Sequence, residues 1–372
     1  MKKDNNRHGS DATGFAASGF GTVNKLFEEE RFHANRGHGF AAERANDLYD
    51  KLTGHFSSVV GDDNAKNGAD RMVNGVLYQT KYYSSASGSV NACFENGGAG
   101  RYKYMTQFGF AMKVEVPADQ YDRAVEVMRD KITRGQVPGV TNPAKAKSLV
   151  VKGHFTYDQA KNIAKAGNID SLMYDATTGV IIGTAAGGIS AILTYLKAKS
   201  EGEDAEEAKK EALKSGLKIG GTSAATTVIA GQLSKSGLSS ALKGGSDVIA
   251  KAIGSGASAT VTNAFRSGAN LSGAAAIKSC SKLIRGNMIT GIATVGVLSA
   301  GDAVKFANHE ITGVEFAENT INRSAQVAAG SAGFIAGQAL IPIPVVGGLI
   351  GSFVAGTLAG KATECVIEKR RN

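Results

Sequence analysis

The residues best suited to chemistry lie between Gly68 and Tyr83. Within this stretch, Asn74-Gly75 separates two runs of residues that favour β-strands. An Asn-Gly pair at such a place favours a type I′ turn, because both central residues of that turn need a positive φ. We therefore predict a β-hairpin, with one strand ending at Val73 and the next running from Val76 to Tyr83.

Alternation along the second predicted strand places Gln79 and Lys81 on the same face. Asp70, at the start of the partner strand, is expected near that face. A carboxylate and an amide oxygen can hold a hard divalent cation, and a lysine can lower the pKa of an attacking water or stabilise charge that develops on a phosphate. The spacing therefore predicts a cation site for phosphate chemistry; the alternative is an ordinary solvated surface hairpin.

This hairpin resembles the core of the PD-(D/E)xK restriction-endonuclease-like nucleases. Their pattern is an Asp, a short gap and then (D/E)-x-K on the next strand. Here the matching residues are Asp70 and Gln79-Thr80-Lys81, with Gln in place of the usual acid. The resemblance, which covers roughly residues 38–135, implies a Mg²⁺ or Mn²⁺ site at Asp70 and Gln79. It also implies that Lys81 assists a water that attacks a DNA phosphodiester.

The Gln in place of an acid removes one negative charge from the implied metal site, so another carboxylate would have to compensate. Members of this superfamily often supply a Glu from the first helix, and Glu43 fits that place. Asp62 and Asp63, which lie nearer to the hairpin in sequence, are the alternatives. The expected catalytic set is therefore Asp70, Gln79, Lys81 and Glu43, with all but the lysine as metal ligands.

The elements expected around the hairpin form a nuclease-like α/β core over residues 38–135. The predicted fold class is an α+β N-terminal domain, a restriction-endonuclease-like mixed sheet with flanking helices, followed by an all-α Gly/Ala-rich helical C-terminal domain. The expected core elements, in chain order, are a helix Ala41–Leu52, a strand Phe56–Gly61, the hairpin, a strand Phe108–Val116 and a helix Ala118–Ile132. The apolar face of the first helix is expected at Ala41, Ala45, Leu48, Tyr49 and Leu52, with Glu43 at its polar edge.

Other segments flank or interrupt this core. Residues 1–37 are expected to be a flexible arm followed by a short helix, because the first 24 are rich in Gly, Ser and Asn. Residues 136–172 are predicted to form a basic linker with two short helices, Ala144–Val151 and Thr156–Ala166. The run Arg101-Tyr102-Lys103-Tyr104 interleaves cations with aromatic rings, which suits either a nucleic-acid contact or a protected edge strand.

From residue 173 onward the composition predicts helices that associate with a membrane. Between Asp175 and Lys197 lie 21 uncharged residues, enough to cross a bilayer. A second uncharged run, Ser324–Gly360, is predicted to form a helical hairpin broken at Pro342 and Pro344. Glycines at four-residue spacing, which let helices approach closely, occur in both runs: Gly179, Gly183 and Gly187 in the first, and Gly333, Gly337, Gly347, Gly351, Gly356 and Gly360 in the second. A soluble Ala/Gly-rich bundle is the alternative.

Charge and cysteine content indicate the cellular setting. The formal net charge of +9 favours a polyanionic partner, either nucleic acid or an anionic membrane surface. Three widely spaced cysteines make neither a zinc spacing nor a disulfide framework, which favours a reducing compartment. We therefore expect the chain at the bacterial inner membrane, with its N-terminal domain in the cytoplasm.

The predicted function is that of a membrane-associated, metal-dependent DNA endonuclease in bacterial defence or in conflict between genetic elements. Its expected partners are DNA, a lipid bilayer and a second copy of the chain bound through the glycine-spaced helices. The alternative is a membrane-disrupting, pore-forming effector whose N-terminal domain is a non-catalytic sensor or nucleic-acid binder, and Gln79 in place of an acid motivates it. A third reading is a nucleic-acid-binding scaffold without catalysis.

Overall fold

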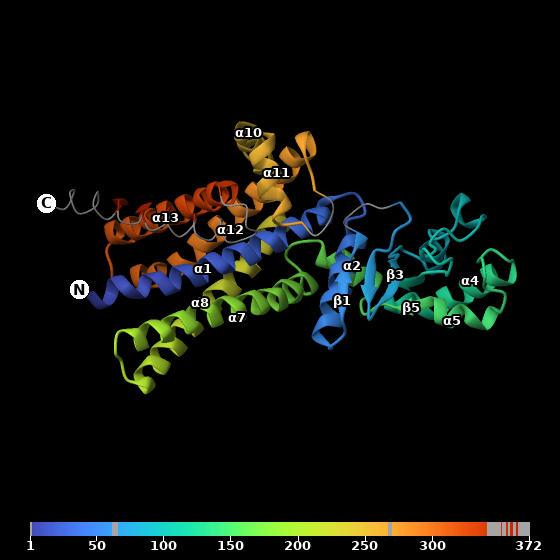
Figure 1. The fold of residues 1–372 in the computed structure, drawn as a ribbon, viewed down its shortest axis with the longest axis horizontal. Coiled ribbons are helices and arrows are strands. Elements are labelled where there is room, and N and C mark those ends of the chain that lie inside the picture. Colours follow the sequence, from blue (N-terminus) through green and yellow to red (C-terminus); the bar gives the residue numbers. More distant parts are fainter. Residues whose placement is uncertain are drawn as a thin grey trace. The chain divides into compact units, whose positions relative to one another are not determined.

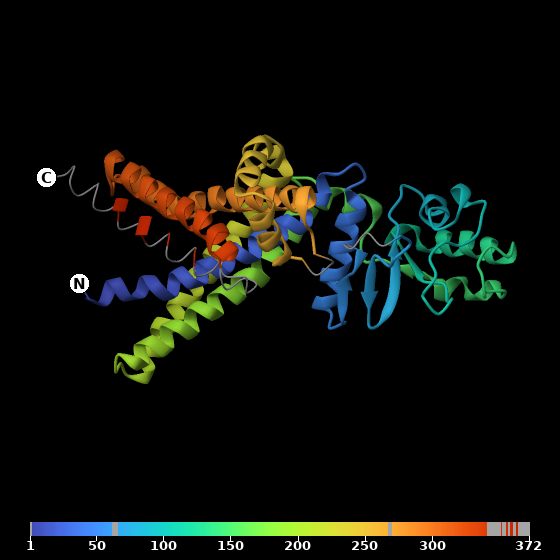
Figure 2. The ribbon, with the colours of Figure 1, turned by 45° about the horizontal axis from the view of Figure 1, so that its top comes forward.

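The computed structural model describes residues 2–61, 66–266 and 270–340, together with residues 351, 355, 358, 359, 362 and 363. The chain divides into two compact units. Residues 31–171 form one, which we call the sheet unit, and residues 1–30 with 172–372 form the other, the helical unit (Figures 1 and 2). A small mixed sheet with flanking helices is followed by an all-helical region, which confirms the predicted α+β and all-α layout.

The sheet unit holds five short strands and the helices between them. Its elements, in chain order, are η1 (Glu30–His33, which begins at the boundary), α2 (His38–Leu52), β1 (Ser57–Val59), β2 (Arg71–Val73), β3 (Val76–Thr80), α3 (Ala86–Asn91), η3 (Asn96–Gly98), β4 (Lys113–Val116), η4 (Ala118–Gln120), α4 (Tyr121–Thr133), η5 (Pro143–Lys145), α5 (Ala146–Leu149), β5 (Val150–Lys152) and α6 (Tyr157–Ile163).

The five strands lie side by side in sequence order. The first three are antiparallel neighbours, whereas β3, β4 and β5 run parallel to one another. Asn74 and Gly75 both have positive φ, 49° and 80°, so the predicted tight turn between β2 and β3 is confirmed. The second strand of the hairpin ends at Thr80, three residues before the predicted end at Tyr83.

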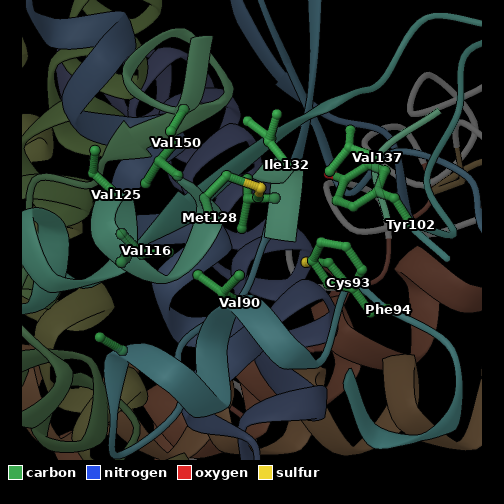
Figure 3. Packing of buried hydrophobic residues seen from close by; sticks show 14 residues of the cluster. Val90, Cys93, Phe94, Tyr102, Val116, Val125, Met128, Ile132, Val137 and Val150 are labelled. Carbon is green, nitrogen blue, oxygen red and sulfur yellow. The ribbon is translucent and has the colours of Figure 1, made fainter. Parts of the chain in front are cut away.

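Helices cover both faces of the sheet. On one face, Val114 and Val116 of β4 pack against Val125 and Met128 of α4, in a core that also includes residues of α3 and β5 (Figure 3). On the other face, α2 contacts β1, β2 and β3 and is itself covered by α6. The result is a three-layer arrangement of helices, sheet and helices.

Three sequence predictions for the sheet unit need correction. The segment read as a helix, Ala144–Val151, ends in a strand, because Val150 and Val151 pair with β4 and extend the sheet. Residues 136–171 are therefore part of the sheet unit and not a separate linker. The predicted strand Phe108–Val116 is a strand only from Lys113 onward.

Helix α2 forms where it was predicted, but it buries a different face. Ala41 and Ala45 are buried as expected, whereas Tyr49 and Leu52 are exposed. The helix instead turns polar residues toward the sheet, and the amide nitrogen of Asn46 donates to the hydroxyl of Tyr82 at 3.0 Å. This rotation buries Glu43, which was predicted to lie at a polar edge.

The helical unit contains long helices joined by short turns. Its elements are α1 (Lys2–Glu29), α7 (Ile169–Ser200, whose first three residues belong to the sheet unit), α8 (Ala205–Leu233), η6 (Ser234–Leu238), α9 (Ser239–Ala241), α10 (Lys243–Ile253), α11 (Ser255–Asn263), α12 (Gly273–Ala307) and α13 (Gly313–Leu340). Helix α12 contacts α1, α8, α10, α11 and α13, so it lies at the centre of this unit (Figure 1).

Residues 2–29, expected to be an arm and a short helix, form one helix that belongs to the helical unit. Val23 and Leu26 are buried in two of its apolar clusters, and Thr22 is fully buried with its hydroxyl 2.8 Å from that of Thr227. The prediction of a flexible arm was wrong because small and polar residues were taken as a sign of disorder. In this helix they are the residues that permit close packing.

The glycines of α7 allow it to lie against α8 with the two backbones in contact. A Cβ added at Gly183 would clash with the carbonyl oxygen of Gly220, and one at Gly187 with that of Gly216. The predicted close approach of helices at this spacing is therefore confirmed, but within one chain. These glycines are occupied by α8 and do not face a second copy.

A similar contact occurs near the C-terminal end of the described residues. A Cβ at Gly351 would clash with the carbonyl oxygen of Gly333 and would also meet Gly337. The other features of the predicted hairpin lie outside the described residues: Pro342, Pro344, Gly347, Gly356 and Gly360.

The helical unit also buries a cluster of charges. Asp175 of α7 is fully buried, and one of its carboxylate oxygens lies 2.8 Å from Lys25 Nζ of α1 and 2.9 Å from Lys235 Nζ. Lys25 in turn pairs with Glu29 at 2.8 Å. Because buried charges are tolerated only when they are paired, these contacts join α1 to α7 and η6.

Two helices of the described residues, α7 and α12, are long and apolar enough to cross a membrane. In both helices, most residues of the most apolar stretch are not buried within the protein. Val180, Ile192 and Leu196 of α7 are each about 60% exposed. A water-exposed surface of this kind on a soluble protein would cost free energy that a lipid environment removes.

The α7–α8 contact gives a direct test of this packing. Replacing Gly183 by Ala should destabilise the helical unit by about 1–3 kcal/mol, because the added methyl group forces the two helices apart. Gly188 of the same helix is the matched control, since a Cβ there meets no neighbour. Gly188→Ala should be neutral or slightly stabilising. Thermal unfolding in detergent, followed by circular dichroism, measures both, and equal effects would refute the backbone contact.

Candidate functional site

Asp70 and Lys81 meet at the open end of the β2–β3 hairpin. Lys81 Nζ lies 2.8 Å from Asp70 Oδ2, and the backbone amide of Thr80 donates to the same oxygen at 3.0 Å. The side chain of Lys81 is 16% exposed and that of Asp70 is 21% exposed, so solvent reaches the pair. The structure thus brings together the carboxylate and the lysine that the sequence predicted to share a face.

Gln79 lies opposite Asp70 in the register of the hairpin and is almost completely buried. Its amide nitrogen donates to the backbone carbonyl of Gly68, whereas its Oε1 atom has no hydrogen-bond partner among the described residues. A buried acceptor without a partner costs free energy comparable to a lost hydrogen bond. The amide oxygen of Gln79 is therefore an acceptor whose hydrogen-bonding capacity is not used within the described residues.

Glu43 belongs to α2, on the Arg71 side of the sheet, and is near enough to Asp70 and Lys81 for their charges to influence it. Its side chain is buried, and burial together with the nearby Asp70 carboxylate raises its pKa to about 8, although Lys81 acts in the opposite direction. The mutual influence of these groups places Glu43 in the electrostatic field of the Asp70–Lys81 pair. The alternative acids, Asp62 and Asp63, lie outside the described residues.

Lys81 remains a cation in this setting. Burial, the largest single effect, lowers its pKa, but the charge and hydrogen bond of Asp70, together with Tyr104 and Cys93, hold the pKa above its ordinary value. The ammonium group is thus suited to neutralising negative charge and not to accepting a proton near neutral pH.

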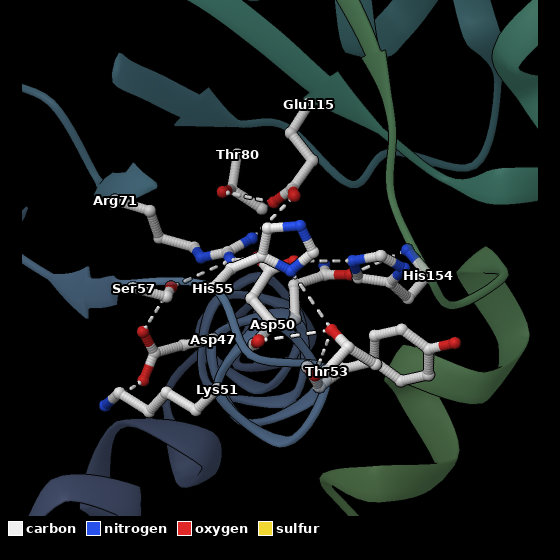
Figure 4. Close-up of polar contacts among 12 residues, drawn as sticks. Asp47, Asp50, Lys51, Thr53, His55, Ser57, Arg71, Thr80, Glu115 and His154 are labelled. Atoms are coloured by element: carbon white, nitrogen blue, oxygen red, sulfur yellow. Dashed lines mark hydrogen bonds and ion pairs between the residues drawn. The ribbon is translucent and has the colours of Figure 1, made fainter. Parts of the chain in front are cut away.

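A buried polar network fixes the direction of these side chains (Figure 4). The guanidinium of Arg71, which is completely buried, bonds to Asp50 of α2 and to Glu115 of β4. The hydroxyl of Thr80 donates to the other oxygen of Glu115 at 2.8 Å. Because strand residues alternate, Arg71 and Thr80 on this face place Asp70, Gln79 and Lys81 on the opposite one.

The network extends along α2 and to the loop after β5. His154 Nε2 lies 2.9 Å from Asp50, its ring stacks on Tyr49 with centroids 4.0 Å apart, and Ser57 donates to Asp47 at 2.7 Å (Figure 4). The sequence reading missed Arg71, Asp50 and Glu115. A charged residue within an apolar strand pattern, such as Arg71, indicates a buried ion pair. The sequence alone does not reveal its partners, because Asp50 and Glu115 lie 21 and 44 positions away.

The donor set suits a hard cation. No group of three or more His, Cys, Asp or Glu side chains able to hold a metal occurs in the described ranges. The candidate site instead offers two carboxylates and one unpartnered amide oxygen, which are the oxygen ligands that Mg²⁺ and Mn²⁺ prefer. A bound cation would also favour ionised Glu43, which burial otherwise disfavours.

The two tyrosines of the run Arg101-Tyr102-Lys103-Tyr104 lie in different surroundings. Tyr102 is buried against Phe94, and its hydroxyl donates to the carbonyl of Met112 at 2.8 Å, so it belongs to the core. Tyr104 is partly buried, with its ring centroid 5.0 Å from Lys81 Nζ. Only Tyr104 thus lies next to the candidate site.

Comparison with known proteins gives a partial match that includes the candidate site. Residues 21–133 match the family described as the YeeR C-terminal domain. Over 102 residues the chain is 52% identical to the inner membrane protein YeeR of Escherichia coli (strain K12), an alignment that covers 27% of this chain. The chain spans only about a fifth of the length of that relative, 20%. No solved structure matches the chain.

The match to the YeeR C-terminal domain begins within α1 and ends at the last residue of α4. It therefore contains Glu43, Asp70, Gln79 and Lys81 but neither β5 nor the apolar helices α7 and α12. The similarity to an inner membrane protein and the two apolar helices are separate observations, and both support association with a membrane.

The raised pKa of Glu43 predicts a pH dependence of stability. In the unfolded chain this carboxyl ionises near its ordinary value of 4.5, but in the folded protein only near 8. Between these two values the folded state binds one more proton, so stability should fall as pH rises, by up to about 1.4 kcal/mol per pH unit, and level off above pH 8. Glu43→Gln should remove this slope.

Urea unfolding of the full chain in detergent and chelator measures the effect. Tyrosine fluorescence reports on the sheet unit, because all tyrosines except Tyr174 and Tyr195 lie there. Glu126→Gln is the control, since Glu126 is an exposed acid of the same unit. A slope that survives in Glu43→Gln would show that Glu43 is not held in its protonated form.

Proposed function

We propose that the sheet unit is a metal-dependent nuclease of the PD-(D/E)xK type that acts on DNA phosphodiesters. The contact that carries the proposal is the 2.8 Å pair of Asp70 and Lys81, beside the unpartnered amide oxygen of Gln79. The order of elements supports it as well: a helix, three antiparallel strands, a helix, a parallel strand and a helix are what the nuclease-like core requires.

Each residue has a distinct task in this proposal. Asp70, Gln79 and Glu43 would hold Mg²⁺ or Mn²⁺, which supplies Lewis-acid stabilisation of a phosphate oxygen and activation of a water. The ammonium of Lys81 would neutralise charge that develops on the phosphate. Burial of Gln79 and Glu43 positions their oxygens before substrate binds, so little reorganisation is needed.

The nuclease-like unit would act at the bacterial inner membrane. The name of the matched relative, inner membrane protein YeeR, and the apolar helices α7 and α12 support this location. The sheet unit would then face the cytoplasm, where DNA is found. Defence against foreign DNA is a role that such a placement would suit.

The second candidate is a membrane-disrupting effector whose sheet unit senses or binds nucleic acid without cutting it. Gln79 in place of an acid favours this candidate, because a neutral amide is a weaker ligand for Mg²⁺ than a carboxylate. On this reading the full chain releases dye from lipid vesicles, and substitution of the site residues leaves that release unchanged.

Cleavage of plasmid DNA tests the first candidate. The purified full chain should nick supercoiled DNA with Mg²⁺ or Mn²⁺ and not with chelator, and Lys81→Ala should lower the rate by about 100-fold or more, because charge on the phosphate is left uncompensated. Lys161→Ala is the control, since Lys161 is a partly exposed lysine of the same unit that pairs with the exposed Asp158. Equal rates for the wild type and Lys81→Ala would eliminate nuclease action at this site, and dye release without cleavage would favour the effector.

A further inference from the structure

A second, smaller hairpin, residues 104–112, lies beside the candidate site and presents two phenylalanines to solvent. Phe108 is 76% exposed and Phe110 is 71% exposed. The backbone around them is fixed, because the amide of Met112 donates to Tyr104 at 2.9 Å and that of Thr106 donates to Phe110 at 2.7 Å. Large apolar side chains held in water by an ordered backbone indicate a binding surface.

The base of this hairpin contacts the candidate site. The ring of Tyr104 lies 5.0 Å from Lys81 Nζ and 5.5 Å from Lys103 Nζ. From Tyr104 to Thr106 the chain advances two residues, roughly 7 Å. One nucleotide covers about 3.4 Å along a stacked strand, so the turn at Thr106–Gly109 begins within about 12 Å of Lys81, on the order of three to four nucleotides.

The charge of the hairpin and its flanks matches a polyanion. Residues 101–113 include Arg101, Lys103 and Lys113 and no acidic residue. Cations alternating with aromatic side chains are typical of surfaces that bind a single nucleic-acid strand, where the cations contact phosphates and the rings stack on bases. The two described helices that are apolar enough for a bilayer belong to the other unit.

We propose that Phe108 and Phe110 stack on unpaired bases of the strand whose phosphate lies at the Asp70–Lys81 pair. The hairpin therefore selects nucleic acid with unpaired bases close to the scissile bond, such as single strands, flaps or bubbles. This inference rests on the proposed function, because it takes nucleic acid as the substrate of the site.

Binding in the absence of cleavage tests the proposal separately from catalysis. The full chain in detergent and chelator is titrated into a fluorescein-labelled 20-nucleotide single strand and into the same sequence as a duplex, with anisotropy as the readout. Phe108→Ala combined with Phe110→Ala should weaken single-strand binding at least tenfold, since stacking contributes about 1–3 kcal/mol per base, and should change duplex binding little.

Two further variants serve as controls. Phe56→Ala removes an even more exposed phenylalanine of the same unit that lies outside the hairpin, and it should bind like the wild type. Phe108→Trp with Phe110→Trp keeps the stacking surface and should retain affinity. Because both phenylalanines are exposed, unchanged circular dichroism is expected for every variant.

The outcomes separate this proposal from the nuclease proposal. Weakened single-strand binding by a protein that never cuts DNA would support the stacking role while refuting nuclease action. Cleavage with unchanged single-strand affinity in the double alanine variant would overturn the stacking role alone. The double alanine variant could instead lose its flotation with anionic lipid vesicles and keep its affinity for DNA. That result would also overturn the stacking role and would assign the hairpin to contact with a membrane.

Discussion

The organisation of the sheet unit depends on one buried guanidinium. Arg71 lies between Asp50 of α2 and Glu115 of β4, with no exposure to solvent. Removing Arg71 alone would leave two carboxylates buried without a counter-charge, which proteins rarely tolerate. The same contact sets which face of β2 and β3 points toward α2. Since strand residues alternate, it also determines that Asp70, Gln79 and Lys81 converge on the other face. The orientation of Asp70, Gln79 and Lys81 is thus a consequence of a structural ion network on the other face of the sheet, the face that α2 and Glu43 cover.

The helical unit is held by a different balance of forces. Glycines at Gly183 and Gly187 let two helix backbones touch, so dispersion contacts act over a long surface that a single methyl group would disturb. The buried Asp175, paired with Lys25 and Lys235, adds a specific contact among α1, α7 and η6. Lys25 and Asp175 both lie within a few residues, in sequence, of the points where the chain passes between the two units. This cluster therefore ties together the two segments of chain that lead to and from the sheet unit.

Local sequence patterns predicted the elements whose structure is decided locally. The Asn74-Gly75 turn, helix α2 and helix α4 formed where they were expected, because turn chemistry and helical periodicity act within a few residues. The pattern also predicted that Asp70 and Lys81 lie near each other, since residues across a tight hairpin are neighbours once the turn is fixed. It could not identify Arg71, Asp50 and Glu115, whose pairing depends on how α2 and β4 pack across the sheet. Strand β5 and helix α1 were missed for the same reason, because their short or polar sequences gain structure only from tertiary contacts.

The central claim is that Asp70, Gln79 and Glu43 share one cation-binding point beside Lys81. An experimental structure of the protein with Mn²⁺, using the anomalous scattering of the metal, tests it most directly. The expected result is one peak at roughly 2.0–2.3 Å from an oxygen of each of the three side chains, with Gln79 Oε1 as one ligand. Saturating Mn²⁺ that leaves this position empty, or a peak elsewhere in the sheet unit, would contradict the account.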